Sequence, residues 1–248
     1  MMQAIGLLTG AGGESSGTPK SINLDGVNKS LTINDLFLGH VTSDRVDSFS
    51  WGVSANLSST ATGPLIGAPG SGQLDCTASI DIVSGTIRAY VQHNATTLTR
   101  RRASSGAFSA GVNFSVCATR GAAIYPALYV DGVAPSGNNG STSSTPNDSV
   151  SVSVGKNGGA HREGKFWAFW WTPVEMSSTQ VAALDALIGS LDYDAAELYL
   201  MAISSDSVFM PVLSTDDLTS STGSVSDLFG NKTSTPVNTS PSDLVEIP

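Results

Sequence analysis

The sequence predicts an all-β domain in which two sheets pack face to face, and three observations lead to this fold class. The first is composition, because 40% of the 248 residues are apolar, only 13% are charged and 26 are glycine. The second is an alternation of apolar and polar residues with a period of two. The third is a set of glycine-containing dipeptides between the alternating segments. Many short strands joined by tight turns have such a composition, and helical bundles do not.

The alternation is clearest between Ser48 and Leu57. One face of this segment is apolar throughout, and the other carries serine, glycine and asparagine. The apolar face consists of Phe49, Trp51, Val53, Ala55 and Leu57. Such a strand buries one face and leaves the other polar. Shorter versions of the pattern predict further strands at Ile22–Leu24, Leu31–Ile33, Ile80–Ile82, Ile87–Val91, Ala127–Tyr129 and Val150–Val154.

Turn residues separate these strands at regular intervals. Asp25-Gly26, Ser84-Gly85 and Asp131-Gly132 are dipeptides typical of β-hairpins, since glycine adopts a positive φ at little cost. The segment from Ser136 to Asn147 is rich in Gly, Asn, Ser and Thr. We expect that segment to form an exposed loop.

One helix is predicted, near residues 177–189. Ser177 and Gln180 form a capping box, and Met176 and Val181 occupy the two positions of a hydrophobic staple. An apolar stripe follows and ends at Gly189, where a left-handed residue is expected. We expect this short, single helix to pack across an open end of the sandwich.

Charge argues against nucleic acid as a partner. The formal net charge is −9, and the one basic run, Arg100–Arg102, is too short to form a groove for phosphates. No apolar run is long enough to span a bilayer, so no membrane partner is expected. The N-terminus lacks the basic segment of a signal peptide, which favours a non-secreted protein. Cys76 and Cys117 are interpreted as small buried hydrophobes, with a disulfide as the alternative.

Several segments resemble a known family in their order and spacing. They are Ser21–Val27 with Leu31–Ile33, Phe49–Val53, Leu128–Val133, Val152–Gly155 with Gly164–Phe166, and the helix after Met176. This series resembles the laminin-G-like branch of the concanavalin-A-like lectin/glucanase superfamily, which implies a two-sheet jelly-roll β-sandwich. After Gly164-Lys165 the family commonly has an acidic pair, whereas this chain has Trp167-Ala168. The resemblance therefore does not extend to calcium, and no metal or cofactor is expected.

The resemblance divides the chain into three parts: an N-terminal arm at 1–19, the sandwich at 20–190 and a C-terminal extension at 191–248. The extension, which packs on the sandwich or on a partner, resembles those of tailed-phage structural proteins, and Asp227–Asn231 resembles a turn that they reuse. This implies a virion protein that is assembled in the host cytoplasm. Its expected partners are other virion proteins and copies of itself, as a trimer or dimer.

An enzyme is not expected. Glucanases of this superfamily carry paired carboxylates on one strand, and none of the five glutamates lies in such a cluster. The histidines, His40, His93 and His161, lie far apart, and no nucleophile-elbow sequence accompanies them. No group of residues has metal-ligand spacing. His161 is interpreted as a solvated loop residue, and Asp216-Asp217 as a hydrated turn.

Candidate contact residues come from an aromatic segment and two loops. In Phe166–Trp171, alternation places Trp167, Phe169 and Trp171 on one face and Trp170 on the other. An outward Trp170 would stack on a sugar or anchor a protein contact, and the alternative is that the helix or the extension covers it. The other candidates, for protein or sugar, are Asn138, Asn139, Asn157 and His161.

Two functional readings follow. The first is a non-enzymatic virion surface protein, either a capsid decoration or a fibre or attachment component. The alternative is a lectin-like module that binds host or environmental polysaccharide.

Overall fold

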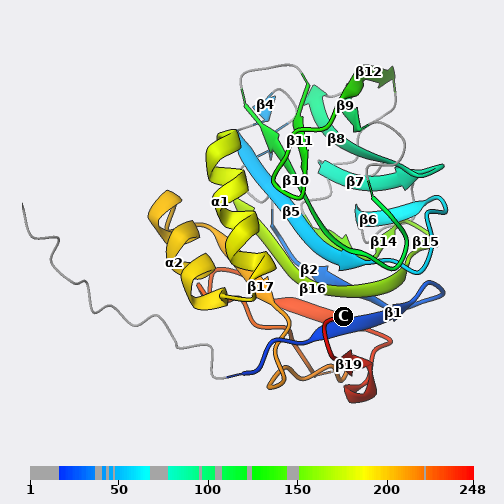
Figure 1. Cartoon of the computed structure of the whole chain (residues 1–248), viewed down its shortest axis with the longest axis vertical. Helices are drawn as coiled ribbons and strands as arrows, with labels where there is room; N and C mark the ends of the chain where they lie inside the picture. Colours follow the sequence, from blue (N-terminus) through cyan, green and yellow to red (C-terminus); the bar gives the residue numbers. More distant parts are fainter. Residues whose placement is uncertain are drawn as a thin grey trace, which may run out of the picture.

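The computed structural model describes residues 17–36, 41–42, 45–46, 48–67, 78–94, 97–103, 108–121, 125–143, 151–220 and 222–248. These residues form the predicted β-sandwich, in which two antiparallel sheets pack face to face (Figure 1). Two helices lie along one side of it, α1 at Ser178–Gly189 and α2 at Tyr193–Ile203. The fold class is confirmed, but the prediction of a single helix is wrong.

The first sheet has seven strands in the order β11-β10-β5-β16-β1-β19, with β17 also paired to β16. The strands are β1 (Ser21–Asp25), β5 (Phe49–Asn56), β10 (Asn113–Arg120), β11 (Ala127–Val130), β16 (Glu163–Thr172), β17 (Val208–Pro211) and β19 (Leu244–Val245).

The second sheet has eight strands in the order β12-β9-β8-β7-β6-β13-β2-β18. The strands are β2 (Ser30–Ile33), β6 (Gly63–Gly67), β7 (Ala78–Val83), β8 (Thr86–Asn94), β9 (Thr97–Ala103), β12 (Gly137–Ser143), β13 (Val152–Val154) and β18 (Ser234–Val237). Two short hairpins complete the strands, namely β3 (Val41–Thr42) with β4 (Arg45–Val46), and β14 (Lys156–Asn157) with β15 (Ala160–His161).

The core lies between the two sheets and consists of the residues that the alternation selected. All five apolar residues predicted for the face of Ser48–Leu57 are fully buried there. The predicted short strands appear as β1, β2, β7, β8, β11 and β13, although Val150 lies outside the described residues. Ser84-Gly85 closes β7 onto β8, and both of its residues have positive φ, as a two-residue hairpin turn requires.

A second apolar layer covers the outer face of the seven-stranded sheet. The two helices pack there around Trp170, which is 1% exposed, so Trp170 is not a surface contact residue, and the alternative expectation that the helix covers it is correct. It does leave the inter-sheet core as expected, but α1 and α2 cover it. A β-bulge between Phe166 and Ala168 also moves Trp167 to this outer layer, whereas strict alternation placed it with Phe169 and Trp171.

Helix α1 begins as predicted, with the capping box of Ser177 and Gln180 present and both staple residues buried. Its end differs, because Gly189 is still helical and Leu191 has the positive φ of 60°. The helix lies along the outer face of the sheet and not across an open end (Figure 1). The reason is that the outer face of the sheet carries apolar side chains from β10, β11, β16 and β17, namely Cys117, Tyr129, Trp167, Trp170 and Phe209.

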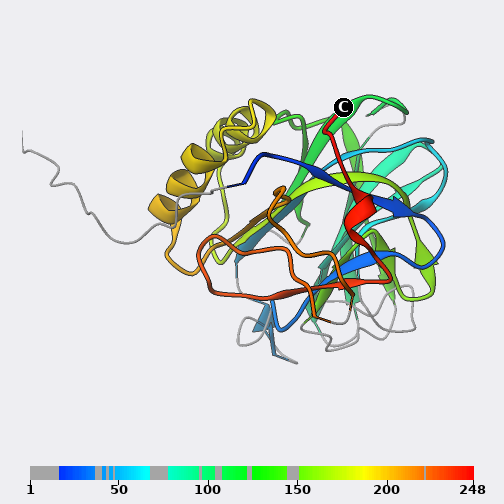
Figure 2. The same ribbon diagram turned by 90° about the horizontal axis from the view of Figure 1, so that it is seen from below.

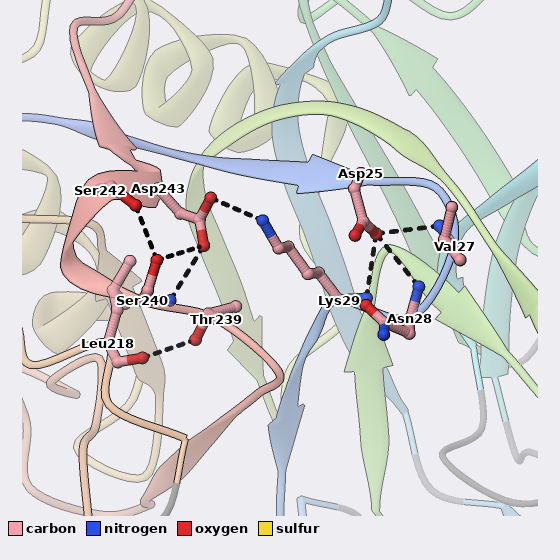
Figure 3. Close-up of polar contacts among 9 residues, drawn as sticks. All are labelled: Asp25, Val27, Asn28, Lys29, Leu218, Thr239, Ser240, Ser242 and Asp243. Carbon is pink, nitrogen blue, oxygen red and sulfur yellow. Dashed lines mark hydrogen bonds and ion pairs between the residues drawn. The ribbon is translucent and has the colours of Figure 1, made fainter.

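Residues 191–248 belong to both sheets, because β17 and β19 pair in the first sheet and β18 pairs in the second. The same segment also contains α2. Seen from below, the orange and red part of this segment, which follows α2, runs across the near end of the sandwich (Figure 2). A polar cluster ties it to the turn between β1 and β2 (Figure 3). There Lys29 Nζ lies 2.8 Å from Asp243 Oδ1, and Asp25 Oδ1 accepts from three backbone N–H groups of the turn. Asp243 also accepts from Ser240.

The remaining sequence predictions concern one loop, one acidic turn, the two cysteines and membrane-spanning segments. Ser136–Asn147 is not a loop over its described part, because Gly137–Ser143 is β12, whose main chain pairs with β9 whatever its side chains are. Asp216 is buried, so the hydrated-turn interpretation holds only for exposed Asp217. Cys117 is a buried free thiol, and Cys76 lies outside the described residues. Within the described part of the chain, no helix has the length and apolar character to cross a membrane.

Candidate functional site

A groove of about 460 Å³ lies on the outer face of the eight-stranded sheet, opposite to the helices. Strands β6, β7 and β8 form its floor, and the β14–β15 hairpin forms one wall. Its polar lining residues are Thr62, Asp81, Arg88, Tyr90, Asn157 and His161.

The floor is built by alternation in β7 and β8. Ile80 and Ile82 of β7 enter the core, so the intervening Asp81 faces outward, and Arg88 is its cross-strand partner in β8. The Arg88 guanidinium donates to both oxygens of Asp81, at 3.0 and 2.8 Å. Its carbon Cζ lies 5.1 Å from the ring centroid of Tyr90. A bidentate ion pair and a cation–π contact fix this side chain in one orientation.

Arg88 is held in its charged form by its neighbours. Burial by itself lowers the pKa of Arg88, but the hydrogen bond and the charge of Asp81 raise that pKa above its ordinary value. The guanidinium is therefore held as a cation at the base of the groove. Since Asp81 uses the Nε and Nη2 groups of Arg88, the Nη1 group has no hydrogen-bond partner among the described residues and keeps its donors for a ligand.

The wall is a tight hairpin that packs directly on β6. A Cβ atom on Gly67 would lie 2.4 Å from Cβ of Asn157, so only glycine at position 67 allows this close approach. Gly158 has a φ of 61° at the hairpin turn, where glycine is also preferred. His161 Nδ1 lies 3.3 Å from the carbonyl oxygen of Lys29, which orients the imidazole.

Buried Arg162 fixes the loop that precedes β6, next to the groove. Its Nη1 donates to the carbonyl oxygen of Ala61 at 2.6 Å, and its Nη2 donates to that of Ser59. A Cβ on Gly63 would lie 3.0 Å from Cδ of this side chain, so the glycine makes room for it. Arg162 thus ties the loop before β6 to the strand that follows the hairpin.

The structure brings two of the five sequence candidates together, because Asn157 and His161 both line the groove. His161 is half-buried in β15 and is not a solvated loop residue. Asn138 and Asn139 lie in β12, two strands beyond β8. Trp170 is buried on the far side of the molecule and cannot serve as a surface contact.

Sequence reasoning missed Asp81, Arg88 and Tyr90, although the signal was present. The alternation that assigned their neighbours in β7 and β8 to the core implies that these three residues point outward. What the pattern could not show is that the β14–β15 hairpin, about 70 residues later in the chain, closes over them.

The groove offers hydrogen-bond donors and acceptors of several kinds, namely a guanidinium, a carboxylate, an amide and an imidazole. Among the described residues, no group of three or more His, Cys, Asp or Glu side chains could hold a metal ion. This arrangement suits a neutral, polyhydroxylated ligand, because such a ligand both donates and accepts hydrogen bonds.

Comparison with known proteins gives matches in structure alone, since no protein-family model and no curated protein matches the sequence. A protein from Bacteroides ovatus that is inferred to bind carbohydrate superposes with a TM-score of 0.55 at 13% identity, over 94% of this chain. The fold is that of jelly-roll, lectin-type domains. This chain spans 62% of the Bacteroides protein. Domains LG4-5 of the mouse laminin alpha1 chain match with a TM-score of 0.42 at 12% identity, over 65% of this chain and 44% of theirs.

Proposed function

We propose that this protein is a non-catalytic carbohydrate-binding module and that a saccharide binds in the groove over β6, β7 and β8. The observation that carries the proposal is the groove itself, a hollow of about 460 Å³ that is lined by both the Asp81–Arg88 pair and His161. Small-molecule sites fall between roughly 300 and 1,000 Å³, so the size is suitable. The carbohydrate-binding role inferred for the Bacteroides protein supports the same assignment.

The chemistry of the groove fits a saccharide. Sugar hydroxyl groups donate to carboxylates and accept from guanidinium and imidazole groups, and both kinds of partner are held rigidly here. Because Arg88 is fixed by Asp81 and Tyr90, little side-chain entropy is lost when a ligand binds. A preorganised polar groove of this kind favours binding without requiring a reactive group.

The proposal is tested by screening the purified protein on a glycan array and measuring the affinity of the best glycan by calorimetry. Arg88→Lys keeps the charge but loses the fork that pairs with Asp81, so we expect binding to weaken about tenfold. His161→Ala removes one hydrogen-bonding group and is expected to weaken binding about three- to tenfold. Asp206→Asn, in an exposed loop after α2, is the neutral control.

Asn139→Ala separates this site from the other sequence candidate. Asn139 is exposed on β12, outside the groove, and its replacement is expected to leave the affinity unchanged. Loss of binding in Asn139→Ala but not in His161→Ala would move the saccharide site to the β12 edge. Incubation with the bound glycan is expected to release no new reducing ends, and their release would contradict the non-catalytic assignment.

We further propose that the module is displayed on a virion surface as a dimer or trimer. Support comes from the resemblance of residues 191–248 to phage extensions and from two exposed apolar side chains, Leu198 and Met201, at i and i+3 on α2. Light scattering behind a sizing column is expected to give two or three times the chain mass of 25.4 kDa. Leu198→Glu should shift that mass to one chain. A monomeric wild-type protein would contradict self-association and leave the saccharide proposal untouched.

A further inference from the structure

A second hollow, of about 230 Å³, lies on the opposite side of the sandwich from the groove. It is enclosed by the C-terminal end of α1, the Asp131-Gly132 turn after β11, the outer faces of β5 and β10, and the last two residues of the chain. Trp167, Leu191 and Ile247 supply the apolar part of its wall. The saccharide proposal makes no use of this site.

Two carboxylates meet at Ser115 in this hollow. Asp131 Oδ1 accepts from the backbone N–H of Ser115 at 2.9 Å, and Asp185 Oδ1 accepts from the Ser115 hydroxyl. Each carboxylate keeps its second oxygen without a hydrogen-bond partner among the described residues. Burial and the nearby charge of Asp131 raise the pKa of Asp185 to about 6, so the two groups are close enough to repel each other.

No cation within the described part of the chain balances these carboxylates. The residues around the hollow include no Lys, Arg or His, and none of the ion pairs involves Asp131 or Asp185. The last turn of α1 has no basic residue, and the carbonyl end of a helix carries partial negative charge. All of these features favour a positively charged occupant.

Ser54 gives an independent indication of a ligand. It lies directly opposite Ser115 in the β5–β10 register, lines the hollow and is 1% exposed. Its hydroxyl oxygen has no hydrogen-bond partner within the described residues. Because buried hydroxyl groups are nearly always paired, an unpaired one that faces a hollow indicates a group that enters from that hollow.

We propose that this hollow binds a small organic ammonium ion, namely a primary amine on a short apolar stem. An ammonium group has three donors, and the site offers three acceptors, one each from Asp131, Asp185 and Ser54. The stem would lie against Trp167 and Ile247. A calcium ion fits less well, because it takes six to eight oxygen ligands and part of this wall is aromatic.

The test is titration of the full chain with n-butylammonium chloride at constant ionic strength, followed by calorimetry and by tryptophan fluorescence. We expect saturable binding of butylammonium and a change in fluorescence, because Trp167 lines the hollow. Asp131→Asn is expected to weaken binding about tenfold through the loss of one charged acceptor. Asparagine tolerates the φ of 49° at this position, so the turn is retained.

Ser54→Ala should weaken binding severalfold, and Asp206→Asn, remote from the hollow, should leave it unchanged. Saccharide binding should be unaffected in all three variants, which keeps this proposal separate from the groove. Absence of saturable butylammonium binding would overturn the proposal. So would equal affinity in Asp131→Asn, or binding of calcium chloride without binding of the amine.

Discussion

Replacement of Trp170 by alanine is expected to lower the free energy of unfolding by about 3–5 kcal/mol, the usual cost of removing a large buried aromatic side chain. Trp170 is 1% exposed and packs between β16 and the two helices. Its register partner in β5 is Gly52, where a Cβ atom would lie 2.2 Å from Cζ2 of the indole. The glycine therefore provides the space in which the ring lies, and truncation of the ring leaves a cavity.

Chemical denaturation measures this change, with Val133→Ala as the control. Val133 is 68% exposed, so its truncation is expected to change stability by less than about 0.5 kcal/mol. Trp170→Ala should leave the saccharide affinity of the folded protein unchanged, because the groove lies on the other sheet. A variant of wild-type stability with altered saccharide binding or oligomeric mass would show instead that Trp170 is a contact residue.

Asp216 is expected to make the protein less stable as the pH rises from about 4 to 7. Burial raises the pKa of Asp216 to about 6, although the N–H groups of Leu213 and Ser226, at 2.7 and 3.1 Å, act in the opposite direction. Between the unfolded pKa of 3.8 and this value, the folded state binds the proton more tightly than the unfolded state does. Stability due to this group is therefore greatest below pH 4 and is lost as the pH rises through 6.

The loss amounts to about 2–3 kcal/mol, at 1.36 kcal/mol for each unit of pKa. It is measured as the difference in unfolding free energy between wild type and Asp216→Asn across this range, because the variant carries no charge there. Subtracting the variant removes the contributions of other groups, such as Asp25, whose pKa is lowered by three backbone N–H donors despite partial burial. The unfolding free energy of the wild type minus that of Asp216→Asn is expected to fall as the pH rises. A value that stays constant or rises with pH would contradict the raised pKa.

Local signals were sufficient for much of the fold. The alternation around Trp51 depends only on the pleat of a strand, so it identified the central strand and its buried face directly. The capping box at Ser177 involves residues three apart, and it appears as predicted. The Ser84-Gly85 turn likewise depends on the φ preferences of two adjacent residues.

Where neighbours distant in sequence decide the outcome, local patterns were insufficient. Helix α2 buries its apolar face against Phe209 and Trp170, which lie in strands of the seven-stranded sheet. The residues of α2 alone do not indicate this contact. The bulge at Trp167 adds a residue to β16, which reverses the face of every position before it. Strand β12 has a loop-like composition, yet it pairs because β9 supplies the hydrogen-bond partners.

The candidate groove combines both kinds of information. Asn157 and His161 could be nominated from their own segment, and the outward positions of Asp81 and Arg88 follow from alternation. Their convergence depends on the packing of the β14–β15 hairpin on Gly67, a contact between segments about 90 residues apart. The sequence by itself determined the strands with clear alternation, such as β5 and β7, their buried faces and the cap of α1, because each depends on neighbours within a few residues. Only the tertiary structure decided the burial of Trp170, the groove and the acidic hollow, because each of these is made by segments that the fold brings together.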